Sequence, residues 1–189
     1  MTSQWPRAYT HFPNIERTSG EFRLRPLRWE DREPIRRWRN EQIDVLRQTA
    51  LLSAEDQDAY YRNVLAPQFA EREPRQILWA LEVNGNLIGY GGLVHIAWSD
   101  ARAEVSFLTE TARVSDLLPD DWAAYLHLLI PVARDSLKFH KLTTETFATR
   151  LEMLPILEAN GFVCEGVLRD HHRESYGWTD SHVHALILS

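Results

Sequence analysis

The spacing of hydrophobic positions divides the chain into helical segments, a run of strands, and a closing alternation of helices and strands. The clearest helical period follows residues 122–137, where apolar side chains recur three and four positions apart. Residues 76–108 instead contain short apolar runs separated by turn residues, which is typical of an antiparallel meander. The patterns predict strand 21–27, helix 30–40, a helix opening at Ser53, strands 76–83, 87–98 and 103–108, helix 122–137, strand 142–147, helix 151–160, and strands 162–168 and 183–188.

Local signals fix several ends of these elements. The run 53–56, Ser-Ala-Glu-Asp, resembles a capping box, and Tyr60, Val64 and Leu65 would form the inner face of the helix that follows. The sequence 84–86, Asn-Gly-Asn, predicts a tight hairpin turn, because Asn and Gly tolerate positive φ. Pro131 predicts a kink in the long helix, because proline offers no backbone N–H.

The order of the elements predicts a mixed α/β fold, with one sheet covered by helices. We expect a single domain over residues 21–189. It is preceded by an N-terminal arm, residues 1–20, that shows neither a helical nor a strand period. The aromatic residues of the arm would pin it to the body or to a second subunit, and a disordered arm is the alternative.

Composition narrows the classes of function. The 189 residues include 44% hydrophobic and 25% charged residues with a net charge of −6, typical of a globular protein without a nucleic-acid or membrane surface. Cys164 is the only cysteine, so no internal disulfide can form and a reducing compartment is favoured. No apolar run reaches the roughly 18 residues of a membrane helix. The start of the chain also lacks a signal-peptide core, so we expect a cytoplasmic protein.

Three motifs in order resemble the GNAT N-acetyltransferase superfamily, in particular its RimJ/RimL-like branch. They are FRLRPLRWEDREPIRRWRN at 22–40, LIGYGGLVHIAWSDARAEVSFL at 87–108 and ILEANGFVCEGVLRD at 156–170. The resemblance implies an acyl-CoA N-acyltransferase fold, whose mostly antiparallel twisted sheet opens between the fourth and fifth strands, 103–108 and 142–147. It also implies acetyl-CoA as co-substrate and a primary amine of a small molecule or peptide N-terminus as acceptor.

Acyl transfer to an amine requires a general base, and the resemblance points to Glu104 on strand 103–108. A structural glutamate paired with Arg102 or Arg23 is the alternative, because a carboxylate on a central strand needs a partner. The resemblance places the backbone of 107–109, that is Phe107, Leu108 and Thr109, beside the thioester arm of the donor.

The phosphate-binding loop departs from the family pattern. The family has a glycine-rich loop that lets backbone N–H groups converge on phosphate, but no glycine occurs here between Gly92 and Gly161. Arg113, Val114 and Ser115 occupy the matching positions. Three aspartates follow at the start of the helix, where they would cap it, take up its free donors and repel a pyrophosphate: Asp116, Asp120 and Asp121.

The second cofactor contact of the family would fall on Thr149 and Arg150, with Arg150 available for a 3′-phosphate. Many relatives have a tyrosine as general acid at the position of Leu157, which cannot donate a proton. Tyr176, in the last hairpin, or water would then take that role.

Acceptor contacts are expected from the end of the first helix, at Trp38, Arg39 and Asn40, and from His95 in the meander. The alternatives are a packing role for Trp38, a solvated side chain for Arg39 and a helix cap for Asn40. For His95 the alternative is a core histidine. No ligand spacing for a metal is present, so none is expected. The altered phosphate loop leaves a non-catalytic binding module as the alternative function, and the sheet edge favours a homodimer.

Overall fold

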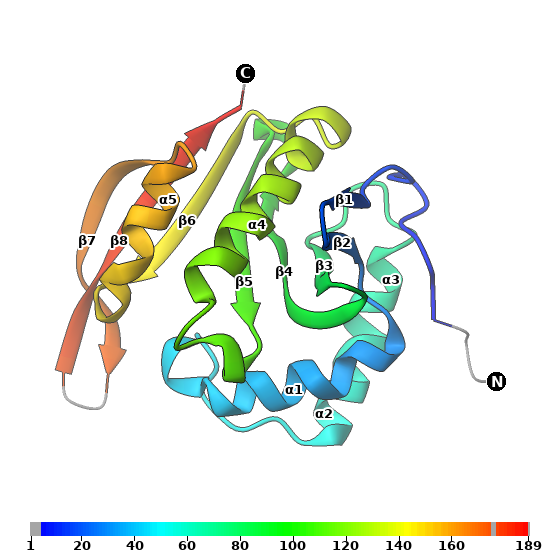
Figure 1. Cartoon of the computed structure of the whole chain (residues 1–189), viewed down its shortest axis with the longest axis horizontal. Helices are drawn as coiled ribbons and strands as arrows, with labels where there is room; N and C mark the ends of the chain where they lie inside the picture. Colours follow the sequence, from blue (N-terminus) through cyan, green and yellow to red (C-terminus); the bar gives the residue numbers. More distant parts are fainter. Residues whose placement is uncertain (1–4, 175–176, 189) are drawn as a thin grey trace.

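The computed structural model describes residues 5–174 and 177–188, and within them eight strands form one sheet in the order β1-β2-β3-β4-β5-β6-β8-β7 (Figure 1). Every neighbouring pair is antiparallel except β5 and β6, which run parallel. The strands are β1 (Arg17–Ser19), β2 (Phe22–Pro26), β3 (Ile77–Val83), β4 (Asn86–Ala97), β5 (Arg102–Thr109), β6 (Lys141–Phe147), β7 (Val163–Glu174) and β8 (Gly177–Ile187).

Helices cover both faces of the sheet, as the mixed α/β fold requires (Figure 1). The α-helices are α1 (Arg32–Glu41), α2 (Ala54–Tyr60), α3 (Ala66–Gln68), α4 (Leu118–Pro131) and α5 (Leu154–Ala159). Among the described residues, no helix combines the length and apolar character needed to cross a membrane.

Two hydrophobic cores lie on opposite faces of the sheet because successive strand residues point to opposite sides. Ala103, Val105 and Phe107 of β5 pack into the larger core with α4 and α5. Leu108 packs into the smaller core, which contains Trp38 of α1 and which we call the lower core. The alternation predicted for 103–108 is therefore confirmed.

The sheet opens between β5 and β6. Their parallel register covers only three residue pairs, Arg102 with Lys141, Ala103 with Leu142, and Glu104 with Thr143. Beyond them the two strands diverge, as Figure 1 shows, while β6 stays paired with β8 along 141–147. The opening predicted between these strands is confirmed.

The helix that opens at Ser53 differs from its prediction in the face it buries. Its capping box is confirmed, because the Ser53 side chain accepts from Asp56 N and the Asp56 carboxylate accepts from Ser53 N. However, Tyr60 and Val64 are 36% and 42% exposed. A π-helical turn at Tyr61–Leu65 follows α2, and both of its end residues are buried, so the predicted inner face is wrong at Tyr60 and Val64.

The predictions made from proline and glycine also have clear outcomes. α4 ends at Pro131 and a π-helical turn, Val132–Ser136, follows it. α5 begins late, at Leu154, with Pro155 in its first turn, where a missing N–H costs nothing. Gly161 follows α5 at φ +86°, a conformation that favours glycine.

The N-terminal segment packs on the body from residue 5 onward. Trp5 Nε1 donates to Leu27 O at 2.7 Å, and Tyr9 and Ile15 are buried in the larger core. β1 belongs to the same segment and pairs with β2. The sequence pattern missed β1. Three residues are too few to show an alternation, so only pairing reveals this strand.

A buried charge network joins β2, β3 and the turn before α1. Arg25 Nε donates to Glu82 Oε1 at 2.6 Å, and its two terminal nitrogens donate to Asp31 at 2.7 and 2.9 Å. Burial alone would lower the pKa of Arg25, but the bonds to Asp31 and Glu82 outweigh it and raise that pKa. The guanidinium therefore stays charged in the protein interior.

Asp31→Ala should lower the free energy of unfolding by about 3–5 kcal/mol, because it leaves a buried guanidinium without its bidentate partner. Urea denaturation followed by circular dichroism measures this change. Glu33→Ala removes an exposed partner of Arg36 and is the matched control, expected to change stability far less. Equal losses in the two variants would contradict the role given to the network.

Candidate functional site

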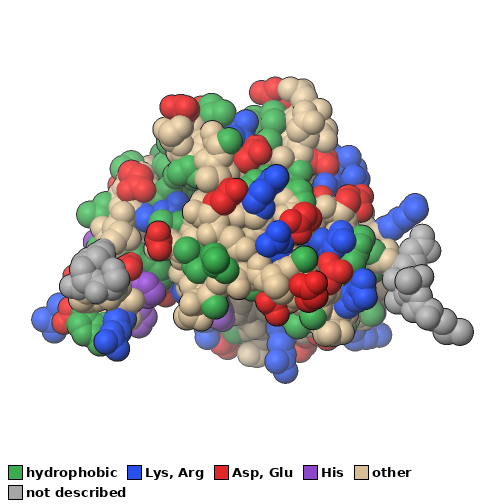
Figure 2. Space-filling view, turned by 90° about the horizontal axis from the view of Figure 1, so that it is seen from below, with side chains coloured by type: hydrophobic (Ala, Val, Ile, Leu, Met, Phe, Trp, Pro, Cys, Tyr) green, Lys and Arg blue, Asp and Glu red, His purple; other side chains and the backbone are tan. Residues whose placement is uncertain are grey.

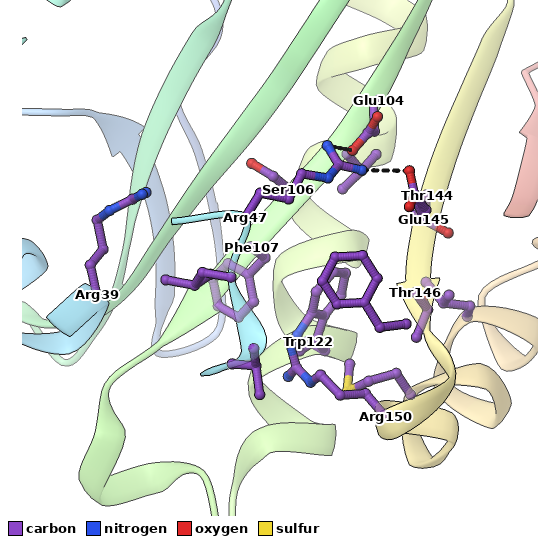
Figure 3. A pocket seen from close by; sticks show the side chains of 16 residues that line it. Arg39, Arg47, Glu104, Ser106, Phe107, Trp122, Thr144, Glu145, Thr146 and Arg150 are labelled. Carbon is purple, nitrogen blue, oxygen red and sulfur yellow. Dashed lines mark hydrogen bonds and ion pairs between the residues drawn. The ribbon is translucent and has the colours of Figure 1, made fainter. Parts of the chain in front are cut away.

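A cavity of about 280 Å³ lies where β5 and β6 diverge, and we call it the cleft (Figure 3). Residues 104–107 of β5 form one wall and residues 144–147 of β6 form the other. Trp122 of α4, Met153 and Leu157 add apolar surface, and Arg39, Arg47 and Arg150 add three cations. The predicted opening of the sheet is therefore a lined cavity and not a packed seam.

Arg47 bridges the two walls at the mouth of the cleft (Figure 3). Its Nη2 donates to Glu145 Oε2 at 2.6 Å, and its Nη1 lies 3.0 Å from Glu104 Oε1. The contact with Glu145 is a hydrogen bond, whereas the contact with Glu104 is an ion pair only. Glu145 therefore holds Arg47 more firmly than Glu104 does, and the Glu104 carboxylate accepts no hydrogen bond from Arg47.

The alternative prediction, that Glu104 pairs with an arginine, is met by Arg47 and not by Arg102 or Arg23, the two candidates from the sequence. Arg102 lies against Asp100, and Arg23 bonds with Glu16. Both arginines are thus engaged elsewhere, and Glu104 faces the cleft with Arg47 beside it.

His95 lies at the outer mouth and not in the core, so the core alternative for this residue is wrong. It is exposed, with φ +49°, within the bulge that shifts the β4–β5 register between Val94 and Ala97. Its Nε2 is 3.5 Å from Arg47 Nη1, and His171 and His172 border the same hollow beside Glu145. In the view from below, histidines gather near the foot of the β7–β8 hairpin (Figure 2).

The strand residues expected beside the donor have buried side chains. Phe107 stacks on Tyr125 with ring centroids 4.3 Å apart, and Leu108 fills the lower core. The Thr109 hydroxyl donates to Asp121 Oδ2 at 2.5 Å. Of these three residues, only Phe107 lines the cleft, and the donor contacts that the resemblance implies at Leu108 and Thr109 stay a prediction.

The phosphate-loop prediction needs correction at Asp121. This side chain is 0% exposed and does not cap α4, because it binds Thr109 and accepts from Arg113 Nε and Nη2 at 2.8 and 2.7 Å. The residue before α4 is Leu117, and no side chain caps it. The predicted capping by aspartate is wrong, and Arg113 neutralises Asp121 instead of offering a free charge.

The neighbouring positions Val114 and Ser115, predicted to contact the cofactor, do not line the cleft. Val114 packs against the larger core, and the Ser115 hydroxyl donates to Asp116 Oδ2 at 2.9 Å. Thus Asp116 is engaged with its own neighbour and does not bond the first turn of α4.

Arg150 lies within the 3₁₀ segment Ala148–Met153, at φ −133° and ψ 43°, and its side chain lines the cleft. Within the described residues it makes no hydrogen bond or ion pair, and burial lowers its pKa. Thr149 is exposed and does not line the cleft. Leu157 is buried at the cleft wall, while Tyr176 lies outside the described residues.

The predicted acceptor contacts separate into two groups. Arg39 lines the cleft, where its Nη1 donates to Tyr90 Oη at 2.7 Å. Trp38 is buried in the lower core, and Asn40 holds the chain at Leu52 through its amide. Neither lines the cleft, so the structure gives Trp38 a packing role and Asn40 a loop-holding role.

The sequence reasoning missed Arg47 and Glu145. Arg47 lies in an irregular loop after the 3₁₀ turn Ile43–Val45, where no period indicates which way a side chain points. Glu145 could have been found, because alternation puts it on the same face of β6 as Thr143, the cross-strand partner of Glu104. Among the described residues, no group of three or more His, Cys, Asp or Glu is arranged to hold a metal ion.

Comparison with known families now decides the class of the protein. The acetyltransferase (GNAT) domain family matches residues 24–183, which is most of the chain. The chain belongs to the GNAT acetyltransferase family. This GNAT protein is therefore an acyl-group-transferring enzyme whose family uses acetyl-CoA. No curated protein sequence matches it.

Solved structures share the fold of this GNAT enzyme at low sequence identity. Spermidine N-acetyltransferase from Vibrio cholerae, in complex with CoA and spermine, has a TM-score of 0.78 at 16% identity, covering 89% of this chain and 96% of its own. An N-acetyltransferase from Staphylococcus aureus Mu50 has a TM-score of 0.72 at 15% identity, covering 90% of this chain and all of its own. At these identities the likeness shows the fold alone.

Asp121→Ala should lower the free energy of unfolding by about 3–5 kcal/mol, because Arg113 and the Thr109 hydroxyl lose a buried partner. Adding Arg113→Ala to Asp121→Ala should recover part of that loss, since the unpaired guanidinium is then gone. A double-mutant cycle by urea denaturation measures the coupling. Strictly additive losses would show that the pair does not interact as described.

Proposed function

We propose that the enzyme transfers an acetyl group from acetyl-CoA to a primary amine of a small molecule or peptide N-terminus, by direct attack in the cleft. The observation that carries the proposal is the position of Glu104. It is the last β5 residue paired with β6, so its carboxylate lies where the open stretch of the strand begins. A base at that place can reach an amine entering from the mouth.

The residues present fit acetyl-CoA in three respects. Beyond Glu104, β5 has no partner strand on the β6 side, so its backbone groups that point to that side have no strand partner and can pair with the amides of the pantetheine arm. The start of α4 has no side-chain cap, which leaves the N–H groups of Leu118 and Asp120 for the pyrophosphate, although Pro119 offers none and the Asp120 carboxylate opposes an anion there. Arg150 supplies a cation without a protein partner among the described residues, suited to a phosphate.

The chemistry requires the amine to be neutral when it attacks. Glu104, directly or through a water, takes the proton from the ammonium, and the nitrogen lone pair then forms the new C–N bond. A backbone N–H of the open β5 edge stabilises the developing oxyanion. The C–S bond breaks, the attacking nitrogen loses its remaining extra proton through water, and the sulfur takes one proton from water or from Tyr176, the general acid that the sequence suggested.

The charges at the mouth favour a cationic acceptor. Glu104 and Glu145 already hold one cation, the guanidinium of Arg47, between them. An ammonium group can compete for Glu104, while the hydrogen bond to Glu145 keeps Arg47 in place. The homodimer remains a proposal, supported by the exposed Val163 and Val167 on the outermost strand β7.

Glu104→Gln should lower kcat by about 100-fold or more, because the amide cannot accept the proton of the ammonium. The affinity for acetyl-CoA, measured by isothermal titration, should stay within about twofold, since the donor binds through backbone and phosphate contacts. Glu165→Gln is the control, because Glu165 pairs with Lys141 away from the cleft.

Two outcomes would oppose the proposed function. Unchanged turnover in Glu104→Gln would remove Glu104 from the role of base. Failure of acetyl-CoA to stabilise the wild-type protein would favour a binding module, because ligand at a hundredfold over Kd should add about 2.7 kcal/mol.

Arg150→Ala should weaken CoA binding by about tenfold, the effect of losing one charge-assisted contact to phosphate. Titrations with CoA and with 3′-dephospho-CoA identify the phosphate. If Arg150 binds the 3′-phosphate, the variant and the wild type should bind 3′-dephospho-CoA with equal affinity. Arg134→Ala, whose arginine pairs with Asp135, is the control and should bind normally. Unaltered CoA affinity in Arg150→Ala would contradict the assignment.

A further inference from the structure

A second cavity, of about 270 Å³, lies between the sheet and the segment formed by α1, α2 and the π-helical turn. Its apolar lining comes from both sides and consists of Leu27, Ile35, Leu52, Leu65, Leu78 and Val94. Three tyrosines, Tyr60, Tyr61 and Tyr90, complete the wall, and we call this space the tyrosine cavity.

The tyrosine cavity continues from the cleft. Arg39 and Ser106 line both spaces. Ser106 is two residues from Glu104 on β5, so the two side chains share one face of the strand. Val94 of the cavity is the cross-strand partner of Glu104. A molecule whose amine meets Glu104 therefore has the tyrosine cavity on the same side of the sheet.

The lining chemistry disfavours a polycation, because the described residues that line the tyrosine cavity include one cation, Arg39, and no anionic Asp or Glu. An ammonium group placed there would lose its water without gaining an anionic partner. The space suits an uncharged group, and a cavity of about 150 Å³ lined by Leu, Ile and Phe is already enough for benzene.

One polar group in the wall has no protein partner. Tyr60 bonds with Gln76 and Tyr90 accepts from Arg39, but the Tyr61 hydroxyl has no hydrogen-bond partner among the described residues. Tyr61 is 1% exposed, and burial raises its pKa well above the ordinary value, so the hydroxyl keeps its proton. This oxygen has less than 1 Å² of accessible surface, so it does not face the cavity, and Tyr61 contributes only the rest of its side chain to the wall.

We propose that the tyrosine cavity is the subsite for the body of the acceptor. The acceptor is then a primary amine that carries an uncharged aromatic or apolar group. This inference rests on the proposed function, because it takes Glu104 as the group that the amine meets.

The test compares aromatic amines with a polyamine. With acetyl-CoA, the wild-type enzyme should turn over 2-(4-methoxyphenyl)ethylamine with a kcat/KM at least tenfold above that for spermidine. Leu52→Trp fills the cavity and should lower kcat/KM for the aromatic amine by tenfold or more. The matched control is Leu51→Trp, at a neighbouring position that is 68% exposed and lines no part of the cavity, and it should stay within twofold.

Titration calorimetry without acetyl-CoA separates this inference from the proposed function. Aromatic amines that bind wild type and not Leu52→Trp, without turnover, would sustain the subsite and refute the transferase proposal. Turnover of spermidine with no preference for aromatic amines would refute the subsite alone. A change in acyl-chain preference among acyl-CoA donors in Leu52→Trp, with amine preference intact, would assign the cavity to the acyl group and overturn the inference.

Discussion

The brevity of the parallel register between β5 and β6 is the constraint on which the rest of the site depends. Only three residue pairs join the strands, and each strand is held on its other edge, β5 by β4 and β6 by β8. The two halves of the sheet therefore separate without losing their own pairing. The separation creates a cavity and leaves a strand edge unpaired beside it, which is the arrangement that an extended donor requires.

Ion pairing decides which charged groups around the cleft remain available to ligands. Arg113 is committed to the fully buried Asp121, and that pairing leaves the start of α4 without a capping side chain. Arg47 is held chiefly by Glu145. Glu104, which accepts no hydrogen bond from Arg47, and Arg150 remain available: Glu104 lies where β5 and β6 are still paired, and Arg150 lies on the segment after β6, as Figure 3 shows.

The face of β5 that carries Glu104 also connects the cleft to the tyrosine cavity, through Ser106 and Arg39. The two spaces differ in polarity. The mouth contains carboxylates and histidines and is polar, whereas the tyrosine cavity is apolar with a single cation in the part that the structure describes. Chemistry at a charged nitrogen and recognition of an uncharged body can thus take place a short distance apart.

The sequence by itself determined the elements that depend on neighbours along the chain. Alternation placed Glu104 and Phe107 on opposite faces of one strand, and turn and capping residues marked the hairpin at 84–86 and the start of α2. The tertiary structure alone decided which charges meet. Arg47 and Glu145 are 98 residues apart, and nothing local indicates that they would share a hydrogen bond. Nothing local in the sequence distinguishes Asp121 from a helix cap either. Its contacts with Arg113 and Thr109 appear only in the tertiary structure. Periods and caps follow from the geometry of a few consecutive residues, whereas ion pairs and cavities arise only when distant segments pack together.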